Sequence, residues 1–229
     1  GYTTAVTLDL AGTGTTGITG TWSGITRVTG TAGSDTVTGA TKTYTLTGAN
    51  AGQSGTVSWT SFENLTDTAT GSFNLNNGGS LSGALNGGTS GTLSYAARTG
   101  PVTLNLSGTG FTGITGAVTN ISTVVGSISG ADTVTGSSKA YNMTGGNAGN
   151  SSGYTWSSFE NLVDTGTGTF NVATGGSVAG TVNGGTNGKV DYTGHAASVS
   201  FNLGGGASTG FATWTNIATV TGAGNASDS

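Results

Sequence analysis

Four charged residues recur in both halves of the chain and are the first candidates for chemistry. The recurring pairs are Asp35 with Asp132, Lys42 with Lys139, Glu63 with Glu160 and Asp67 with Asp164. Glu63 and Asp67 could act as the acid and the nucleophile of a polysaccharide-cleaving enzyme, since glycoside hydrolysis uses two carboxyl groups. Each copy would then need its own complete site. We instead interpret these residues as turn carboxylates that accept backbone N–H groups, and we expect no enzymatic activity.

The chain has a single histidine, which limits the other kinds of catalytic site. His195 stands where Arg98 and Tyr2 stand in the other copies of the repeat. A position that accepts His, Arg and Tyr in turn is typical of a solvated surface. One histidine cannot supply a Ser-His-Asp triad or a histidine-based metal site in every repeat. We therefore expect no catalytic residue and no cofactor-binding residue.

The tryptophans fall into two classes. Trp59 and Trp156 both stand three residues before a repeated FENL sequence, and we expect them in the core. Trp22 and Trp214 share a position that Val118 fills in the middle copy, so they are the candidates for exposed contacts with a ligand. Threonine-rich strands could also present a flat hydroxyl surface of the kind that binds ice, although threonine equally suits any wet strand face.

The spacing of these residues reflects an internal repeat. WTSFENLTDTATGSFNLNNGGS begins at Trp59, and WSSFENLVDTGTGTFNVATGGS begins 97 residues later at Trp156. We divide the chain into repeat 1 (residues 1–100), repeat 2 (101–197) and a partial repeat 3 (198–229), arranged as one continuous elongated array.

Apolar and polar residues alternate in runs of four to six, as in Val6, Leu8 and Leu10, which is the pattern of strands with one buried face. Glycine and asparagine fill the turns between the runs. The sequence predicts an all-β fold, namely a β-solenoid of the β-helix or β-roll kind with internal repeats of about 97 residues. Tandem immunoglobulin-like β-sandwiches are the alternative, since such a domain has about 100 residues. With 46 glycines among 229 residues, a sandwich would have difficulty filling its core.

Composition excludes several classes of function. Charged residues are 6% of the chain, the net charge is −4, and the five basic residues are scattered, which argues against nucleic-acid binding. There is no cysteine, hence no disulfide and no thiolate metal site. No run of 18 apolar residues is present, so we expect no membrane span.

One segment resembles a calcium-binding repeat. GTAGSDTVT (residues 30–38) matches the nonapeptide GGxGxDxUx at Gly30, Gly33, Asp35 and Val37, and its counterpart SISGADTVT keeps Gly130, Asp132 and Val134. Together with phrases such as FENL, NGG and VTLNL, these motifs resemble RTX-like and filamentous-haemagglutinin-like adhesins and fibres of the bacterial surface. Asp35 and Asp132 are therefore the candidates for metal ligands. Because Ca²⁺ takes six to eight oxygens and these turns are 97 residues apart, we expect both residues to cap local amides, with calcium as the alternative.

The resemblance implies a secreted or cell-surface protein, located in an extracellular filament, an adhesin stalk or a biofilm matrix. We expect a non-catalytic structural segment whose partners are further coils, supplied by head-to-tail self-association or by covalent continuation of the array. Glycans or surfaces are further partners to expect. The alternatives are a glycan- or ice-binding module and, more remotely, a polysaccharide-cleaving β-helix enzyme.

Overall fold

The structure is a computed structural model that describes residues 1–224 and 227–229. Its regular secondary structure consists of 19 strands without a helix, and they form a β-solenoid of about 7 turns. The predicted fold class is confirmed. Among the described residues, no helix is long and apolar enough to span a membrane. Asn225 and Ala226, which fall in the predicted partial repeat 3, lie outside the described residues.

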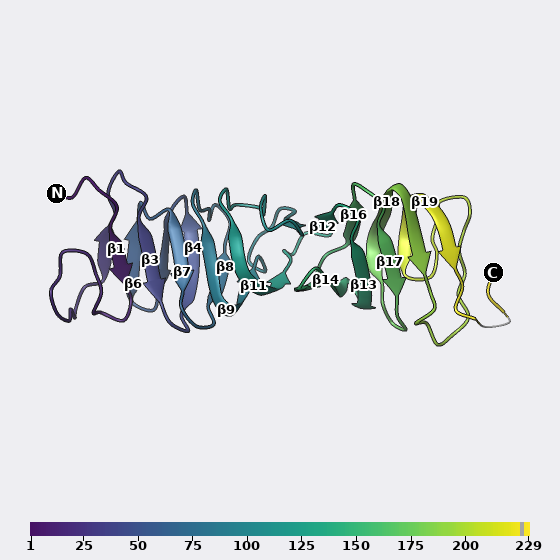
Figure 1. Cartoon of the computed structure of the whole chain (residues 1–229), viewed down its shortest axis with the longest axis horizontal. Helices are drawn as coiled ribbons and strands as arrows, with labels where there is room; N and C mark the ends of the chain where they lie inside the picture. The colour runs from purple at the N-terminus through teal and green to yellow at the C-terminus, as the bar shows by residue number, and fades with distance from the viewer. Residues whose placement is uncertain (225–226) are drawn as a thin grey trace. The chain divides into compact units, whose positions relative to one another are not determined.

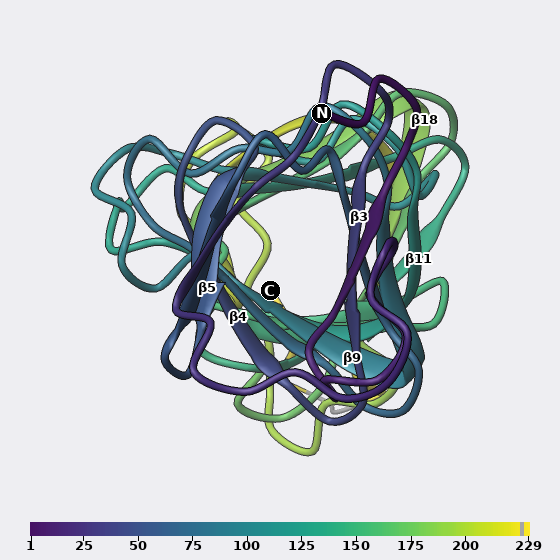
Figure 2. The same cartoon turned by 90° about the vertical axis from the view of Figure 1, so that its left-hand side faces the viewer.

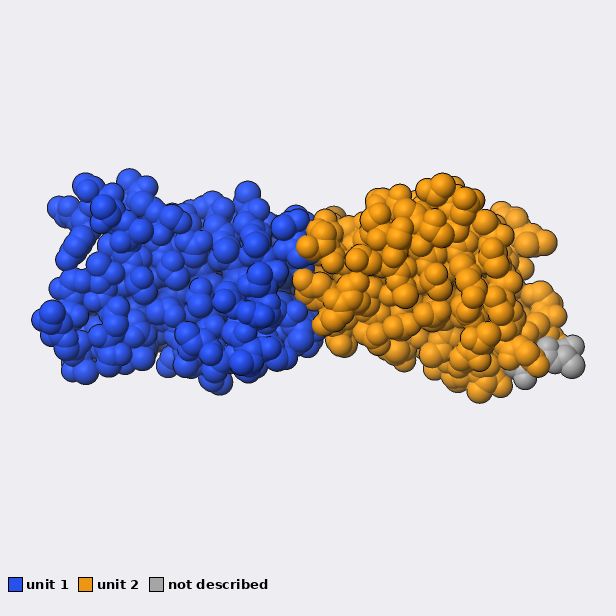
Figure 3. Space-filling model, in the orientation of Figure 1, with its two compact units in different colours: residues 1–99, 108–124 blue, residues 100–107, 125–229 orange. Residues whose placement is uncertain are grey.

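The chain forms two compact units (Figure 3). Unit 1 contains residues 1–99 and 108–124, and unit 2 contains residues 100–107 and 125–229. The chain first passes from unit 1 to unit 2 next to the predicted repeat boundary at residue 100. Residues 108–124 of the predicted second repeat, however, belong to unit 1.

The strands are 3 to 14 residues long, and most of them recur in the same order in the two units. Those of unit 1 are β1 (Thr7–Asp9), β2 (Arg27–Thr29), β3 (Thr36–Gly39), β4 (Thr43–Gly48), β5 (Ala51–Ser54), β6 (Val57–Thr60), β7 (Asn64–Asp67), β8 (Ser72–Leu75) and β9 (Leu85–Ser94). Strand β11 (Val118–Val125) lies in unit 1 up to residue 124. Those of unit 2 are β10 (Thr103–Asn105), β12 (Thr133–Gly136), β13 (Ala140–Gly145), β14 (Ala148–Ser151), β15 (Tyr154–Ser157), β16 (Asn161–Asp164), β17 (Thr169–Val172), β18 (Val178–Asp191) and β19 (Phe211–Thr221).

Each unit is built of walls in which strands of successive coils pair in parallel. We define wall A of unit 1 as β1, β3, β7 and the start of β9, and its wall B as β4, β8 and the end of β9. Figure 1 shows β1, β3 and β7 side by side, and the end view of Figure 2 shows β3 and β4 on different walls. In unit 2, wall A is β10, β12, β16 and the first parts of β18 and β19.

The register of wall A repeats between the units. Val37 pairs with Leu65 and Leu65 with Leu85, which are steps of 65 − 37 = 28 and 85 − 65 = 20 residues. In unit 2, Val134, Leu162 and Val182 pair with the same two steps, 162 − 134 = 28 and 182 − 162 = 20. Successive coils therefore stack in parallel, which excludes the sandwich alternative, since the sheets of an immunoglobulin fold are antiparallel.

One feature of the coil was not predicted, a double hairpin inside each repeat. Strands β4, β5 and β6 pair antiparallel in sequence, and β13, β14 and β15 do the same in unit 2. Gly52 of β5 lies over the ring of Trp59 of β6, where a Cβ atom would come within 2.9 Å of the indole. The glycine leaves room for this large side chain, which is 1% exposed.

Inward-facing side chains stack in columns along the coils. In unit 1 the wall A column is Leu8, Val37, Leu65 and Leu85, all 0–1% exposed. In wall B, Tyr44 stacks on Phe73 with ring centroids 4.8 Å apart, and Tyr141 stacks on Phe170 at 4.9 Å in unit 2. The predicted alternation is thus confirmed at the centres of the strands, whereas Val6 and Leu10 beside them are only half-buried.

A glycine is required where two coils approach most closely. A Cβ on Gly126 would lie 1.9 Å from the carbonyl oxygen of Ser158, and Gly30 has the same relation to Ser61. Gly130 of the same turn has no atom within 4 Å of the corresponding position. The close approach, and not the turn as a whole, therefore excludes a side chain.

These two glycines give a matched test of the coil spacing. Gly126→Ala should lower the free energy of unfolding by about 3 kcal/mol, because the backbone of one coil must move away from the next. Gly130→Ala should change it by less than about 0.5 kcal/mol. Urea denaturation of both variants measures the difference, and equal midpoints would contradict the close approach at Gly126.

Candidate functional site

Asp35 is fully buried at the corner before wall A and joins three coils. Its Oδ1 accepts the N–H of Val6 at 2.8 Å and the hydroxyl of Thr31 at 3.0 Å, and its Oδ2 accepts the N–H of Thr31. Its own N–H donates to Glu63 Oε2 at 2.8 Å. The carboxylate therefore satisfies backbone donors that the parallel ladder leaves unpaired.

The same arrangement recurs in unit 2. Asp132, also fully buried, accepts the N–H of Val102 at 2.9 Å and both the N–H and the hydroxyl of Ser127, while its N–H donates to Glu160 at 3.0 Å. Asp228 in the last coil accepts the N–H of Val199 at 3.1 Å and that of Ala223 at 2.8 Å. One aspartate thus fixes this corner in all three copies of the sequence.

The recurring glutamates connect this corner to a neighbouring turn. Besides the amide of Asp35, Glu63 accepts the side-chain amide of Asn50 at 3.1 Å, and Glu160 accepts that of Asn147 at 3.0 Å. Asn50 and Asn147 have φ of 50° and 52°, in the left-handed region that asparagine tolerates better than most residues. The glutamate therefore holds a turn with an unusual backbone conformation.

The second recurring aspartate holds the corner between walls A and B. Asp67 is 1% exposed and accepts three backbone N–H groups, from Thr41, Lys42 and Ala69, at 2.8–2.9 Å. The Tyr44 hydroxyl donates to its Oδ2 at 3.1 Å. Asp164 has the same partners in unit 2, namely Ser138, Lys139, Gly166 and Tyr141.

The recurring carboxylates are therefore engaged in hydrogen bonds within the fold. Glu63 precedes β7 and Asp67 ends it, and the two side chains bind different corners. A calcium ion at Asp35 or Asp132 would have to replace the N–H groups that these oxygens accept. Within residues 1–224 and 227–229, no group of three or more His, Cys, Asp or Glu side chains could hold a metal ion.

The structure separates the two classes of tryptophan. Trp59 and Trp156 are 1% exposed, as predicted, and their indole N–H groups have no partner in the described part of the chain. Trp22 and Trp214 are half-buried, and each donates its indole N–H within its own coil, to Thr15 Oγ1 and to the Asn202 carbonyl, both at 2.9 Å. Their proposed contact with a ligand stays a prediction.

The outward face of wall A carries mixed ranks of polar side chains. One rank of unit 1 consists of Asp9, Thr38, Thr66 and Asn86. The equivalent rank of unit 2 consists of Asn105, Thr135, Val163 and Asn183. Threonine is interrupted in both ranks, so neither rank forms the regular row of hydroxyls that the ice-binding alternative needs.

Arg98 has a structural role that the sequence did not reveal. Its Nε donates to the Leu75 carbonyl at 3.3 Å, its Nη2 donates to the Gly79 carbonyl, and its guanidinium lies 5.7 Å from the ring centroid of Tyr95. Because Tyr and His replace Arg in the other copies, the sequence predicts a solvated position here. The contact could not be predicted from the other copies, because neither a Tyr nor a His side chain can donate to two carbonyls in this way.

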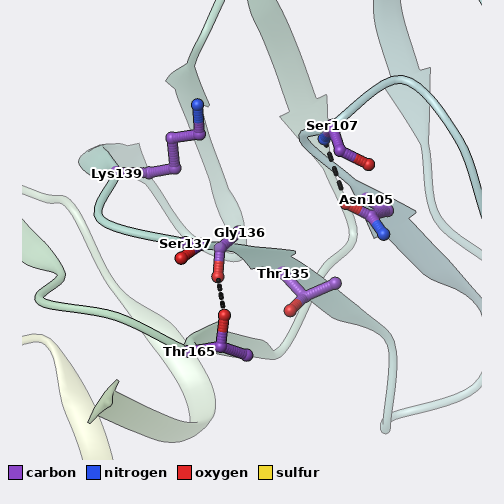
Figure 4. Close-up of a pocket in the computed structure, with 7 residues that line it drawn as sticks. All are labelled: Asn105, Ser107, Thr135, Gly136, Ser137, Lys139 and Thr165. Carbon is purple, nitrogen blue, oxygen red and sulfur yellow. Dashed lines mark hydrogen bonds between the residues drawn. The ribbon is translucent and has the colours of Figure 1, made fainter. Parts of the chain in front are cut away.

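A pocket of about 380 Å³ opens on wall A of unit 2 (Figure 4). Its lining residues are Asn105, Ser107, Thr135, Gly136, Ser137, Lys139 and Thr165. They come from the end of β10, the end of β12, the loop before β13 and the residue after β16. The figure shows Lys139 on one side and Asn105 with Ser107 on the other. Hydroxyl, amide and ammonium groups thus share one cavity.

The corner role of Asp132 can be tested by an isosteric change. Asp132→Asn places an NH₂ group against donors, so we expect a loss of about 2–3 kcal/mol in the free energy of unfolding. The control Asp191→Asn, in a surface ion pair with Lys189 at 2.7 Å, should cost less than about 1 kcal/mol. Both are measured by denaturation in chelator. If the parent chain is more stable than Asp132→Asn only when Ca²⁺ is present, the carboxylate holds a cation instead.

The buried phenols predict how stability depends on alkaline pH. Burial raises the pKa of Tyr44 and Tyr141, the charges of Asp67 and Asp164 raise these pKa values further, and burial also raises the pKa of Tyr95 and Tyr192. Because the folded chain retains phenolic protons that the unfolded chain releases above pH about 10, stability should be complete below that pH and fall above it.

Absorbance at 295 nm counts the ionised tyrosines as the pH rises. At a pH of about 11, the folded chain should show clearly fewer phenolates than its six tyrosines would give, with the rest appearing together with loss of the β-type circular dichroism. Ionisation of all six tyrosines in a chain that stays folded would contradict the burial of these phenols.

Comparison with known proteins found no matching family model, no similar curated protein and no similar solved structure.

Proposed function

We propose that the chain is a structural, non-catalytic segment of a secreted bacterial fibre, filament or adhesin stalk. The observation that carries this proposal is the use of the recurring carboxylates. Asp35, Glu63 and Asp67, with their counterparts in unit 2, all accept backbone N–H groups at coil corners. Residues that recur in each repeat thus serve the coil, which is the expected result when a structural module is copied.

Side-chain contacts between coils support a mechanical role. Asn120 donates to Asn86 at 2.9 Å, and Asn216 donates to Asn183 at 3.0 Å in unit 2. Hydroxyl pairs such as Ser90 with Ser122, at 2.7 Å, add further links. Each link is small, but together with the backbone ladder they resist separation of the coils.

The chemistry of the surface supports an extracellular place. Lys and Arg together number five in 229 residues, so trypsin-like proteases meet few cleavage sites. A surface of Thr, Ser and Asn offers many neutral hydrogen-bonding groups, which suits attachment to a matrix through many weak contacts. The resemblance to RTX-like and filamentous-haemagglutinin-like proteins supports the same location, and we propose other copies of the chain as partners.

Location and the absence of catalysis can be tested separately. Antibodies raised against the chain should label intact source cells, or fibres around them, without permeabilisation. The purified chain should release no reducing ends from a panel of polysaccharides. Labelling confined to permeabilised cells would overturn the extracellular location.

The double variant Glu63→Gln and Glu160→Gln is the control for catalysis. It should lose about 1 kcal/mol of stability per site, because each substitution weakens a hydrogen bond at a corner. Its behaviour toward polysaccharides should equal that of the parent chain. Turnover by the parent that the folded double variant lacks would overturn the structural proposal.

A further inference from the structure

We propose that the pocket around Lys139 in unit 2 binds a sugar that carries a carboxylate, of the uronic acid class. This site goes beyond the structural role proposed above and does not depend on it. Its volume of about 380 Å³ lies within the range of about 300–1,000 Å³ that is usual for small-molecule sites. No aromatic residue lines it, so recognition would depend on polar groups.

The charge of the pocket comes from one lysine. In the part of the chain that the structure describes, the one ion pair is Lys189 with Asp191, so Lys139 has no salt-bridge partner there. Asp164 lies close to the backbone of Lys139, but it accepts three backbone N–H groups and the Tyr141 hydroxyl. A ligand carboxylate can therefore pair with the ammonium group without displacing a protein carboxylate.

The remaining groups suit the hydroxyls of a sugar. Asn105 accepts the N–H of Ser107 through Oδ1 at 3.0 Å, so the Nδ2 donors of Asn105 point away from that amide. Thr135 and Ser137 add hydroxyls from the end of β12 and the residue after it, and a hydroxyl can both donate and accept. One cation beside several neutral hydrogen-bonding groups matches a singly charged polyol better than a multiply charged phosphate.

Unit 1 contains the equivalent lysine among different neighbours, and the comparison shows which residues would make the pocket of unit 2 suitable for an anion. Lys42 corresponds to Lys139, but Asp9 stands in place of Asn105, and Ala11 and Ala40 stand in place of Ser107 and Ser137. The Asp9 carboxylate accepts the N–H groups of Ala11 and Gly14. Its negative charge is close enough to contribute to the raised pKa of Tyr44. An anionic sugar should therefore prefer unit 2.

The test uses the whole chain and a defined probe. Titration with galacturonate, followed by NMR or calorimetry, should show one site per chain, and neutral galactose should bind at least about tenfold more weakly, as expected for loss of a charge-assisted hydrogen bond. Lys139→Gln should lower the galacturonate affinity by a similar factor. Lys42→Gln, the matched control in unit 1, should leave it unchanged. Both variants should fold, because the bonds of Lys139 and Lys42 to the corner aspartates use their backbone N–H groups.

Asn105→Asp provides a second variant that keeps the acceptor for the Ser107 amide. It recreates the residue found in unit 1 and should abolish galacturonate binding while the melting temperature stays close to that of the parent. The proposal is overturned if galacturonate does not bind, if galactose binds equally well, or if Lys42→Gln weakens binding as much as Lys139→Gln does.

Discussion

The corners of the coil depend on one interaction, a buried carboxylate that accepts backbone N–H groups. Wherever the chain turns from one wall to the next, its amides leave the ladder, and a buried donor without a partner costs about 1–3 kcal/mol. Each of the nine acidic residues accepts at least one backbone N–H. Asp35 shows the consequence most clearly, because its contacts with Val6 and Glu63 join the coils before and after its own.

This use of acidic residues leaves little charge for other purposes. The anions serve the backbone, so the outward ranks of wall A consist mainly of neutral hydroxyl and amide groups. The single ion pair of the described residues lies at the end of β18, where that strand pairs with β17. A cation at the surface can then lack an ion-pair partner within the protein. Lys139 is in that situation, and the pocket beside it owes its character to the same constraint that fixes the corners.

The fold could be predicted because its signals are local. Alternation such as Tyr44 and Leu46 marks strands, and repetition marks stacked coils. Partners across coils could not be predicted, since residues such as Asp35 and Glu63 meet only in one register, 63 − 35 = 28 residues apart. The backbone conformations at the corners could not be predicted either, because Thr41 and Ser138 adopt left-handed φ values of 54° and 53° although neither is glycine. The cavity at Lys139 likewise combines three segments that are distant in sequence.

The two units differ where the coil imposes no requirement. The acidic residues at the corners are the same in both units, whereas outward residues change, as Asp9 to Asn105, Thr43 to Ala140 and Thr92 to Lys189. A substitution at a corner removes the partner of a buried amide, but a substitution on an outward rank alters only the surface. A copied coil can therefore acquire a different surface in each repeat while its backbone stays the same, and this allows a structural repeat to carry a binding site in one copy alone.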